Sequence, residues 1–260
     1  MKNPLVLLTL VVSTCAVAQP YQHEMLTYYD DDAKPTKEKK AVMLKQQIQL
    51  SDTLWETNIY WQNGPRSISI QSATADDMAR DGTCITYRQD GWADTLGYYK
   101  KGKRNGNWLV FDGKYLIWQL HFDEDRLIWK KDTLELKRER DSIKTTNAND
   151  TLTKVEIESE YPGGARAWLR FLDNTLRYPE KAVKKNLMGQ VTIGFVVDAH
   201  GIVPPASLWL KQSASYPLDK EGLRVIYLSG NWIPAMQFGK KVKSYKLQPL
   251  IFRMETFNKF

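Results

Sequence analysis

The chain has 260 residues and carries 37 Lys and Arg against 30 Asp and Glu, a net charge of +7 at pH 7. This length is enough for two modest domains, each with its own apolar core. Only two cysteines are present, which excludes a small fold held together by a framework of disulfides.

Residues 1–18 have the features of a secretory signal peptide. Lys2 precedes an apolar run from Leu5 to Val17, and Ala16-Val17-Ala18 forms an A-x-A cleavage site. The run is shorter than the roughly 20 residues that span a bilayer. We therefore expect a cleaved signal and a periplasmic mature protein. Two alternatives stay open: a membrane anchor formed by the uncleaved segment, and a lipid attached to Cys15.

Charge is divided unevenly along the rest of the chain. Residues 151–260 carry 16 Lys and Arg against 9 Asp and Glu, a net +7, whereas residues 19–150 carry 20 against 21, a net −1. A basic surface favours an anionic partner such as anionic lipid, an envelope polymer or an acidic protein segment. An exported protein rarely meets nucleic acid, so no nucleic-acid partner is expected. A solvated basic surface without a partner is the simpler alternative.

The N-terminal half changes character near residue 41. Residues 19–40 are polar, with three aspartates at 30–32 followed by a lysine-rich stretch, which predicts a flexible leader. From 41 to 129, short alternating apolar runs are separated by Gly and Asn, and six of the nine tryptophans lie in this region. This pattern predicts a domain of β-hairpins.

The hairpin region contains an internal repeat. DGTCITYRQDG at 81–91 aligns with NGNWLVFDGK at 105–114, so that Cys84 matches Trp108 and Tyr87 matches Phe111. A recurring Gly and aromatic at a fixed spacing predict stacked hairpins. The segment GYYKKGKRNGNWLVFD resembles MORN repeats, and the resemblance extends over about residues 64–129. It implies a scaffold whose aromatic side chains fill a hairpin core. A groove of exposed aromatics that binds sugar or peptide is the alternative.

Two further regions follow. Residues 130–154 are rich in charged residues, Thr and Asn and poor in large apolar ones, which predicts a linker. Residues 155–260 have the pattern of an α+β domain with helices on one side of a small antiparallel sheet.

The elements of this domain follow from periodicity and from turn residues. A helix is expected after Pro162-Gly163-Gly164, and Tyr178-Pro179 ends it and opens a second helix. An alternating strand runs from Val191 to Val197. A turn then leads to a strand around 202–210, a helix around 219–228 and a last strand at 244–254.

The C-terminal region resembles the TonB C-terminal domain over about residues 155–254. The matching residues are Pro162-Gly163-Gly164, Tyr178-Pro179, Ala182, Gly189, Val191, Phe195 to Asp198, Gly201, Leu218-Asp219, Leu223, Trp232, Pro234, Gly239-Lys240, Val242, Pro249 and Phe252. The resemblance implies a periplasmic protein-interaction domain that engages an outer-membrane receptor or another envelope protein, with a possible role in transport or energy transduction.

The resemblance further implies that the last strand forms an edge of the sheet, and this edge is the expected partner surface. An edge strand has unpaired N–H and C=O groups that can pair with an extended peptide. The partner-binding residues predicted on this basis are Tyr178, Pro179, Tyr245, Leu247, Gln248 and Leu250. The same edge could instead pair with a second copy of the chain, giving a homodimer. An envelope-binding module that holds an anionic or glycan surface through the basic or aromatic face is the alternative function.

No enzyme is predicted, and neither are a cofactor, a metal site or a small-molecule substrate. His23, His121 and His200 are far apart in the sequence, and no metal-ligand spacing, G-x-S-x-G elbow or phosphate-binding loop is present. Cys84 and His121 could form a nucleophile and base, although the match of Cys84 to Trp108 favours a buried structural thiol. Asp123 to Asp125 could hold a cation weakly, or form a solvated turn.

Overall fold

The computed structural model describes residues 23–75, 79–135, 138 and 157–254. The predicted signal peptide and most of the predicted linker lie outside these residues. No helix within the described ranges is long and apolar enough to cross a membrane.

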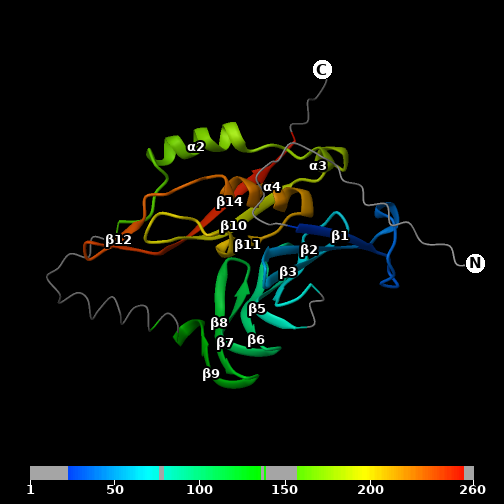
Figure 1. The fold of residues 1–260 in the computed structure, drawn as a ribbon, viewed down its shortest axis with the longest axis horizontal. Helices are drawn as coiled ribbons and strands as arrows, with labels where there is room; N and C mark the ends of the chain where they lie inside the picture. The colour runs from blue at the N-terminus through cyan, green and yellow to red at the C-terminus, as the bar shows by residue number, and fades with distance from the viewer. Residues whose placement is uncertain (1–22, 76–78, 136–137, 139–156, 255–260) are drawn as a thin grey trace, which may run out of the picture.

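The first part of the chain forms a nine-stranded antiparallel sheet in which each strand pairs with the next along the sequence (Figure 1). Its strands are β1 (His23–Tyr29), β2 (Met43–Ser51), β3 (Leu54–Trp61), β4 (Arg66–Ser72), β5 (Arg80–Tyr87), β6 (Ala93–Lys100), β7 (Lys103–Asp112), β8 (Tyr115–Asp123) and β9 (Arg126–Asp132). A short 3-10 helix, η1 (Glu38–Lys40), lies between β1 and β2. The hairpins predicted for residues 41–129 are present.

One face of this sheet has its own apolar cluster, formed by Ile70, Cys84, Trp108 and Phe122. The aligned residues Cys84 and Trp108 are therefore both buried on the same face. Trp108 lies across Gly97, where an added Cβ would come within 2.0 Å of the indole ring. This hairpin arrangement agrees only loosely with MORN repeats, so that part of the resemblance stays a prediction.

The structure differs from the expected flexible leader. Residues 23–29 form β1, which pairs with β2 from His23↔Gln49 to Tyr29↔Met43. The carboxylate of Glu24 in β1 accepts hydrogen bonds from Lys220 and Tyr216, about 190 residues later in the chain. The composition of residues 19–40 predicts a flexible leader because it is polar. It contains no information on partners that lie so far away in the sequence.

The C-terminal part contains a three-stranded sheet, a two-stranded hairpin and three α-helices within the described residues. The elements are α2 (Gly164–Thr175), α3 (Glu180–Lys184), β10 (Gly189–Val197), the 3-10 helix η2 (Pro205–Ser207), β11 (Trp209–Gln212), α4 (Tyr216–Tyr227), β12 (Ala235–Gln237), β13 (Lys240–Val242) and β14 (Ser244–Phe252). The small sheet has the order β11-β10-β14, and all its pairs are antiparallel. Together with the large sheet, this confirms the α+β fold class.

Most elements of this part lie where the sequence pattern puts them, with one shift and one omission. The strand expected around 202–210 begins only at Trp209, because Pro204-Pro205 direct the chain into η2 instead. The hairpin β12–β13 was not predicted, since its strands are only three residues long.

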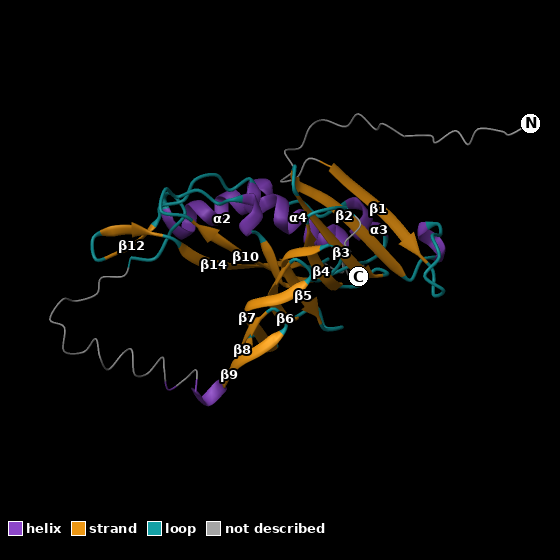
Figure 2. Cartoon of the chain, turned by 60° about the horizontal axis from the view of Figure 1, so that its bottom comes forward, coloured by secondary structure: helices purple, strands orange, loops and turns teal. Residues whose placement is uncertain are grey.

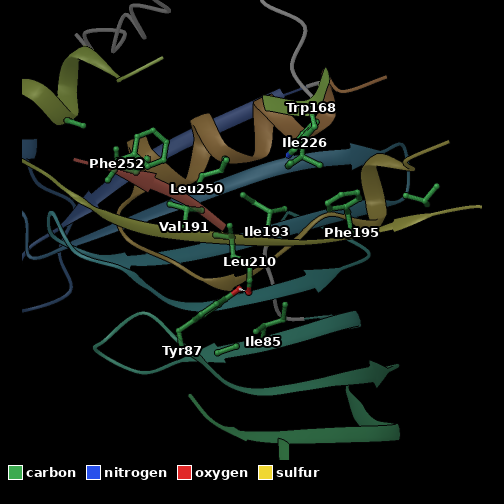
Figure 3. Close-up of a cluster of buried hydrophobic side chains, with 14 of the residues drawn as sticks. Ile85, Tyr87, Trp168, Val191, Ile193, Phe195, Leu210, Ile226, Leu250 and Phe252 are labelled. Carbon is green, nitrogen blue, oxygen red and sulfur yellow. Dashed lines mark hydrogen bonds between the residues drawn. The ribbon is translucent and has the colours of Figure 1, made fainter. Parts of the chain in front are cut away.

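A single apolar core joins the large sheet to the C-terminal part. Ile85, Tyr87 and Ala93 of the large sheet belong to the same buried cluster as Ile193 and Leu210 of the small sheet (Figure 3). Figures 1 and 2 show α2 and α4 on one side of the small sheet and β5–β9 on the other.

Hydrogen bonds reinforce this junction. The Tyr87 hydroxyl donates to the carbonyl of Leu210 at 3.0 Å, drawn as a dashed line in Figure 3. The backbone N–H of Ser213 donates to the carbonyl of Gly91 at 2.9 Å, and the backbone N–H of Arg66 donates to Ser213 Oγ at 2.7 Å. The sheet that contains the last strand, β14, is therefore packed against the large sheet and hydrogen-bonded to it.

Candidate peptide-binding edge

β14 is an edge strand of the small sheet. β10 lies in the middle, and the outer side of β11 is bridged by Trp92 to Gln212. No residue in the described ranges pairs with the outer side of β14. The predicted last strand is thus an edge that offers its main-chain groups along one side.

Pro249 shows which backbone groups face outward. β14 pairs with β10 without a bulge, and Pro249 lies opposite Thr192. Because proline has no N–H to donate to the ladder, its backbone is expected to face away from β10. In an antiparallel pair this outward orientation recurs at every second residue, so we infer it for Tyr245, Leu247 and Ile251. The outward edge then has N–H donors at these three positions and lacks one at Pro249.

The same alternate positions expose their side chains. Tyr245 is 71% exposed, Leu247 57% and Ile251 53%. These side chains line the face of the small sheet away from α4, whereas Leu250 lies in the core with 3% exposed. At Pro249 the carbonyl accepts a hydrogen bond from Gln248 Nε2 at 2.9 Å. The edge therefore combines main-chain groups that are available on either side of Pro249 with an adjacent apolar stripe.

The four predicted partner-binding residues of β14 fall into two groups. Tyr245 and Leu247 are exposed on β14, as the edge hypothesis requires. Gln248 and Leu250 point to the opposite face, where Gln248 Oε1 accepts a hydrogen bond from Trp168 Nε1 at 3.0 Å. Leu250 is buried, so its side chain supports the strand from inside and does not reach the surface.

Tyr178 and Pro179 lie near the far end of β14. The Tyr178 hydroxyl donates to the carbonyl of Leu187 at 2.6 Å, and its ring meets Phe252 edge to face at 5.6 Å. Burial raises the pKa of Tyr178. Pro179 is the residue that precedes α3. This pair braces the end of the strand.

A groove of about 260 Å³ between α2 and β14 was missed by the sequence analysis. Its walls include Trp168, Phe195, Trp232 and Leu247, and the rings of Trp168 and Trp232 are 5.2 Å apart. The sequence showed these aromatics only as helix-spaced or family-matched residues. Nothing in their spacing indicated that they gather beside the edge strand.

The possible catalytic pair of Cys84 and His121 is contradicted by the structure. β6 and β7 separate their strands, β5 and β8. Cys84 shares a cluster with Phe122, whose neighbour His121 points to the opposite face of the sheet. His121 Nδ1 hydrogen-bonds Asn107 Oδ1 at 2.8 Å, and its ring stacks on Trp129. The two groups cannot act on one substrate atom.

The acidic run at 123–125 is occupied by ion pairs. Asp123 contacts Arg126, Glu124 contacts Lys103, and Asp125 contacts Arg104, with N–O distances between 3.0 and 3.4 Å. Among the described residues, no three His, Cys, Asp or Glu side chains gather in a way that could hold a metal ion.

The C-terminal part of the chain is a small α+β unit with an open edge strand. Residues 174–254 match the family described as Gram-negative bacterial TonB protein C-terminal. The match covers less than half of the chain and extends from the end of α2 through β14. It supports the TonB-like C-terminal domain and indicates an envelope-associated interaction role for this region. Comparisons with curated proteins and with solved structures gave no match.

Proposed function

We propose that the protein captures an extended segment of an envelope protein by adding it as a strand to the outer side of β14. The observation that supports this most directly is the unpaired edge itself, with exposed Tyr245, Leu247 and Ile251 beside it. In strand addition, main-chain hydrogen bonds supply affinity, and pockets for alternate side chains supply selectivity.

The edge also suggests what the captured segment looks like. Side chains on one face of the added strand would lie beside Tyr245 and Leu247. Those on the other face would reach the groove lined by Trp168 and Trp232. Both surfaces are apolar, so the segment should be extended and apolar on both faces. Pairing should skip Pro249, where the edge has no donor.

The partner class follows from the TonB-like region and from the proposed export. We assign the mature chain to the periplasm, after cleavage behind residue 18, and the partner to an outer-membrane receptor or another envelope protein. A role in transport or energy transduction would follow from such a contact. Self-pairing of β14 in a homodimer would compete with the partner for the same edge.

The alternative is an envelope-binding module that holds an anionic surface. The exposed lysines at 240, 241 and 243, next to β14, favour it. Salt distinguishes the two, because screening weakens binding between exposed charges far more than main-chain pairing between strands.

The test compares Leu247→Pro with Leu247→Thr in the full chain. Extended peptides selected from a displayed library against the wild-type chain serve as probes. Proline removes the outward N–H and leaves the bonds to β10 in place, whereas threonine keeps that N–H. Leu247→Pro should weaken peptide binding about tenfold or more, and Leu247→Thr by less than about threefold.

Hydrogen exchange then locates the contact. Peptide binding should increase the protection of amides in 244–252, and circular dichroism should show that both variants stay folded. Equal weakening by the two substitutions would contradict strand pairing. So would protection that rises only in the lysine-rich segment 180–187.

A further inference from the structure

A second cavity lies between the large sheet and the small one. It encloses about 350 Å³ and is lined by strands β3 to β7 on one side and by Val196, Trp209 and Tyr245 on the other. This volume is within the range of small-molecule sites, which often occur between packed units of a fold.

A buried arginine lies in the polar wall of this cavity. Arg66 is 3% exposed, and its Nε and Nη2 donate to the hydroxyl of Tyr60 at 3.1 and 2.7 Å. Nη1 forms an ion pair with Glu56 Oε1 at 3.8 Å. Tyr60 and Glu56 therefore hold the guanidinium in a fixed position in the wall of the cavity.

Two hydroxyl groups on the same wall of the cavity have no partner among the described residues. Ser69 and Thr83 line the cavity, and neither side chain hydrogen-bonds to another described residue. Between them, Gln71 Oε1 accepts from the backbone N–H of Thr83 at 3.0 Å. This wall therefore offers a row of donors and acceptors with unfilled positions.

The opposite part of the cavity is apolar and rigid. It includes Leu96, Leu109 and the ring of Trp209. The indole of Trp209 packs directly against the backbone of Gly194, because an added Cβ at this glycine would come within 2.2 Å of Trp209 Nε1. Tyr245 supplies a second aromatic side chain at the rim.

The charges on the polar wall nearly cancel. Arg66 and Glu56 face each other there with opposite signs, so an ionic ligand would gain little from either. A neutral ligand with many hydroxyl groups along one side and C–H bonds along the other fits both walls. We propose that this cavity binds a neutral saccharide unit, with its hydroxyls toward Arg66, Ser69 and Thr83 and its C–H face on Trp209.

The cavity shares the side chain of Tyr245 with the proposed peptide edge, but its polar groups differ from those of the edge. They belong to β4 and β5 of the large sheet, whereas peptide capture uses the main-chain groups of β14. A chain that binds peptide and no saccharide, or the reverse, would separate the two.

Calorimetric titration of the full chain tests the proposal, with glucose, N-acetylglucosamine and their β-1,4-linked disaccharides as probes. At least one should bind saturably at one site. Thr83→Val removes only a hydroxyl and should weaken binding about fivefold, the effect of one lost hydrogen bond. Thr83→Leu also fills space and should weaken it further. Thr86→Leu, three residues along on the opposite face of β5, is the matched control and should bind normally.

Several results would overturn the assignment. Absence of saturable binding by all four probes would do so, as would binding that Thr83→Val and Thr83→Leu leave unchanged. Octanoate, a carboxylate with an apolar tail, is the comparison ligand. If octanoate binds saturably and the saccharides do not, the cavity takes an anionic amphiphile and the saccharide assignment is wrong. Valine is close in shape to threonine, so the Thr83→Val variant still tests the proposal if the Thr83→Leu variant does not fold.

Discussion

The thiol of Cys84 lies in a cluster with Ile70, Trp108 and Phe122 and is 3% exposed. Burial raises the pKa of Cys84 to about 11, because the thiolate would lose its hydration. The thiolate is the reactive form, so the raised pKa leaves roughly a hundredth of the usual thiolate fraction at pH 8.

We therefore expect Cys84 to be unreactive in the native chain. In a Cys15→Ser background, a disulfide reagent at pH 8 should modify Cys84 at least about 100-fold more slowly in the native state than in denaturant. The denatured chain is the control for reagent quality. Equal rates in the two states would show that the hairpin cluster opens readily.

Asp219 is a buried carboxyl at the start of α4. Burial raises the pKa of Asp219 to about 6, although Arg66 and hydrogen bonds from Ser213 and Ala214 favour the charged form. A folded-state pKa above the unfolded value of 3.8 means that the folded chain binds the proton more tightly. This contribution to stability is full below about pH 4 and is lost as the pH rises through 6.

Asp219→Asn should remove this dependence. From pH 4 to pH 7 the unfolding free energy of the variant should rise relative to wild type by about 2 to 3 kcal/mol. Urea unfolding at several pH values measures the difference. A constant difference across this range would mean that Asp219 keeps an ordinary pKa in the folded chain.

The hairpin of β6 and β7 depends on one close approach between elements. Trp108 of β7 covers Gly97 of β6, where a side chain would meet the indole at 2.0 Å. Gly97→Ala should therefore destabilise the chain by about 1 to 3 kcal/mol. In a Trp108→Leu background the same substitution should cost much less, since the clash is gone. Thermal unfolding of the four chains measures the coupling, and additive effects would contradict it.

Among the elements, those with a clear periodic pattern or marked by turn residues could be predicted from the sequence. α2, α3, β10 and β14 follow from helical spacing, from Tyr178-Pro179 and from strict alternation. β1 was not predicted because it lies in a polar stretch of the sequence. Its Glu24 is held by hydrogen bonds from Lys220 and Tyr216, which are distant in the sequence. The edge position of β14 came from the family resemblance, whereas the groove beside it depends on aromatics from α2 and the segment around Trp232.

For the whole molecule, the chief feature hidden from the sequence is the shared core. Composition divided the chain at residues 130–154, yet Ile85 and Tyr87 pack with Ile193 and Leu210. Contacts between residues about 100 positions apart leave no local periodic signature. The alternation of apolar and polar residues in a strand shows that one face is buried, but it does not show which element covers that face. The interfacial cavity beside Arg66 was hidden for the same reason.

The shared core predicts that the two regions unfold together. Ile85→Ala, in the large sheet, removes apolar contacts from the core that also contains β10 and β14, and should cost about 2 to 5 kcal/mol. Native-state hydrogen exchange should show lower protection in β10 and β14 as well as in β5. Ile70→Ala is the matched comparison, since Ile70 is also a buried isoleucine of the same sheet but belongs to the separate cluster with Cys84. It should reduce protection in β10 by a smaller amount. If Ile85→Ala leaves the protection of β10 and β14 unchanged, the C-terminal part folds independently of the large sheet, and the edge strand β14 is held by its own domain alone.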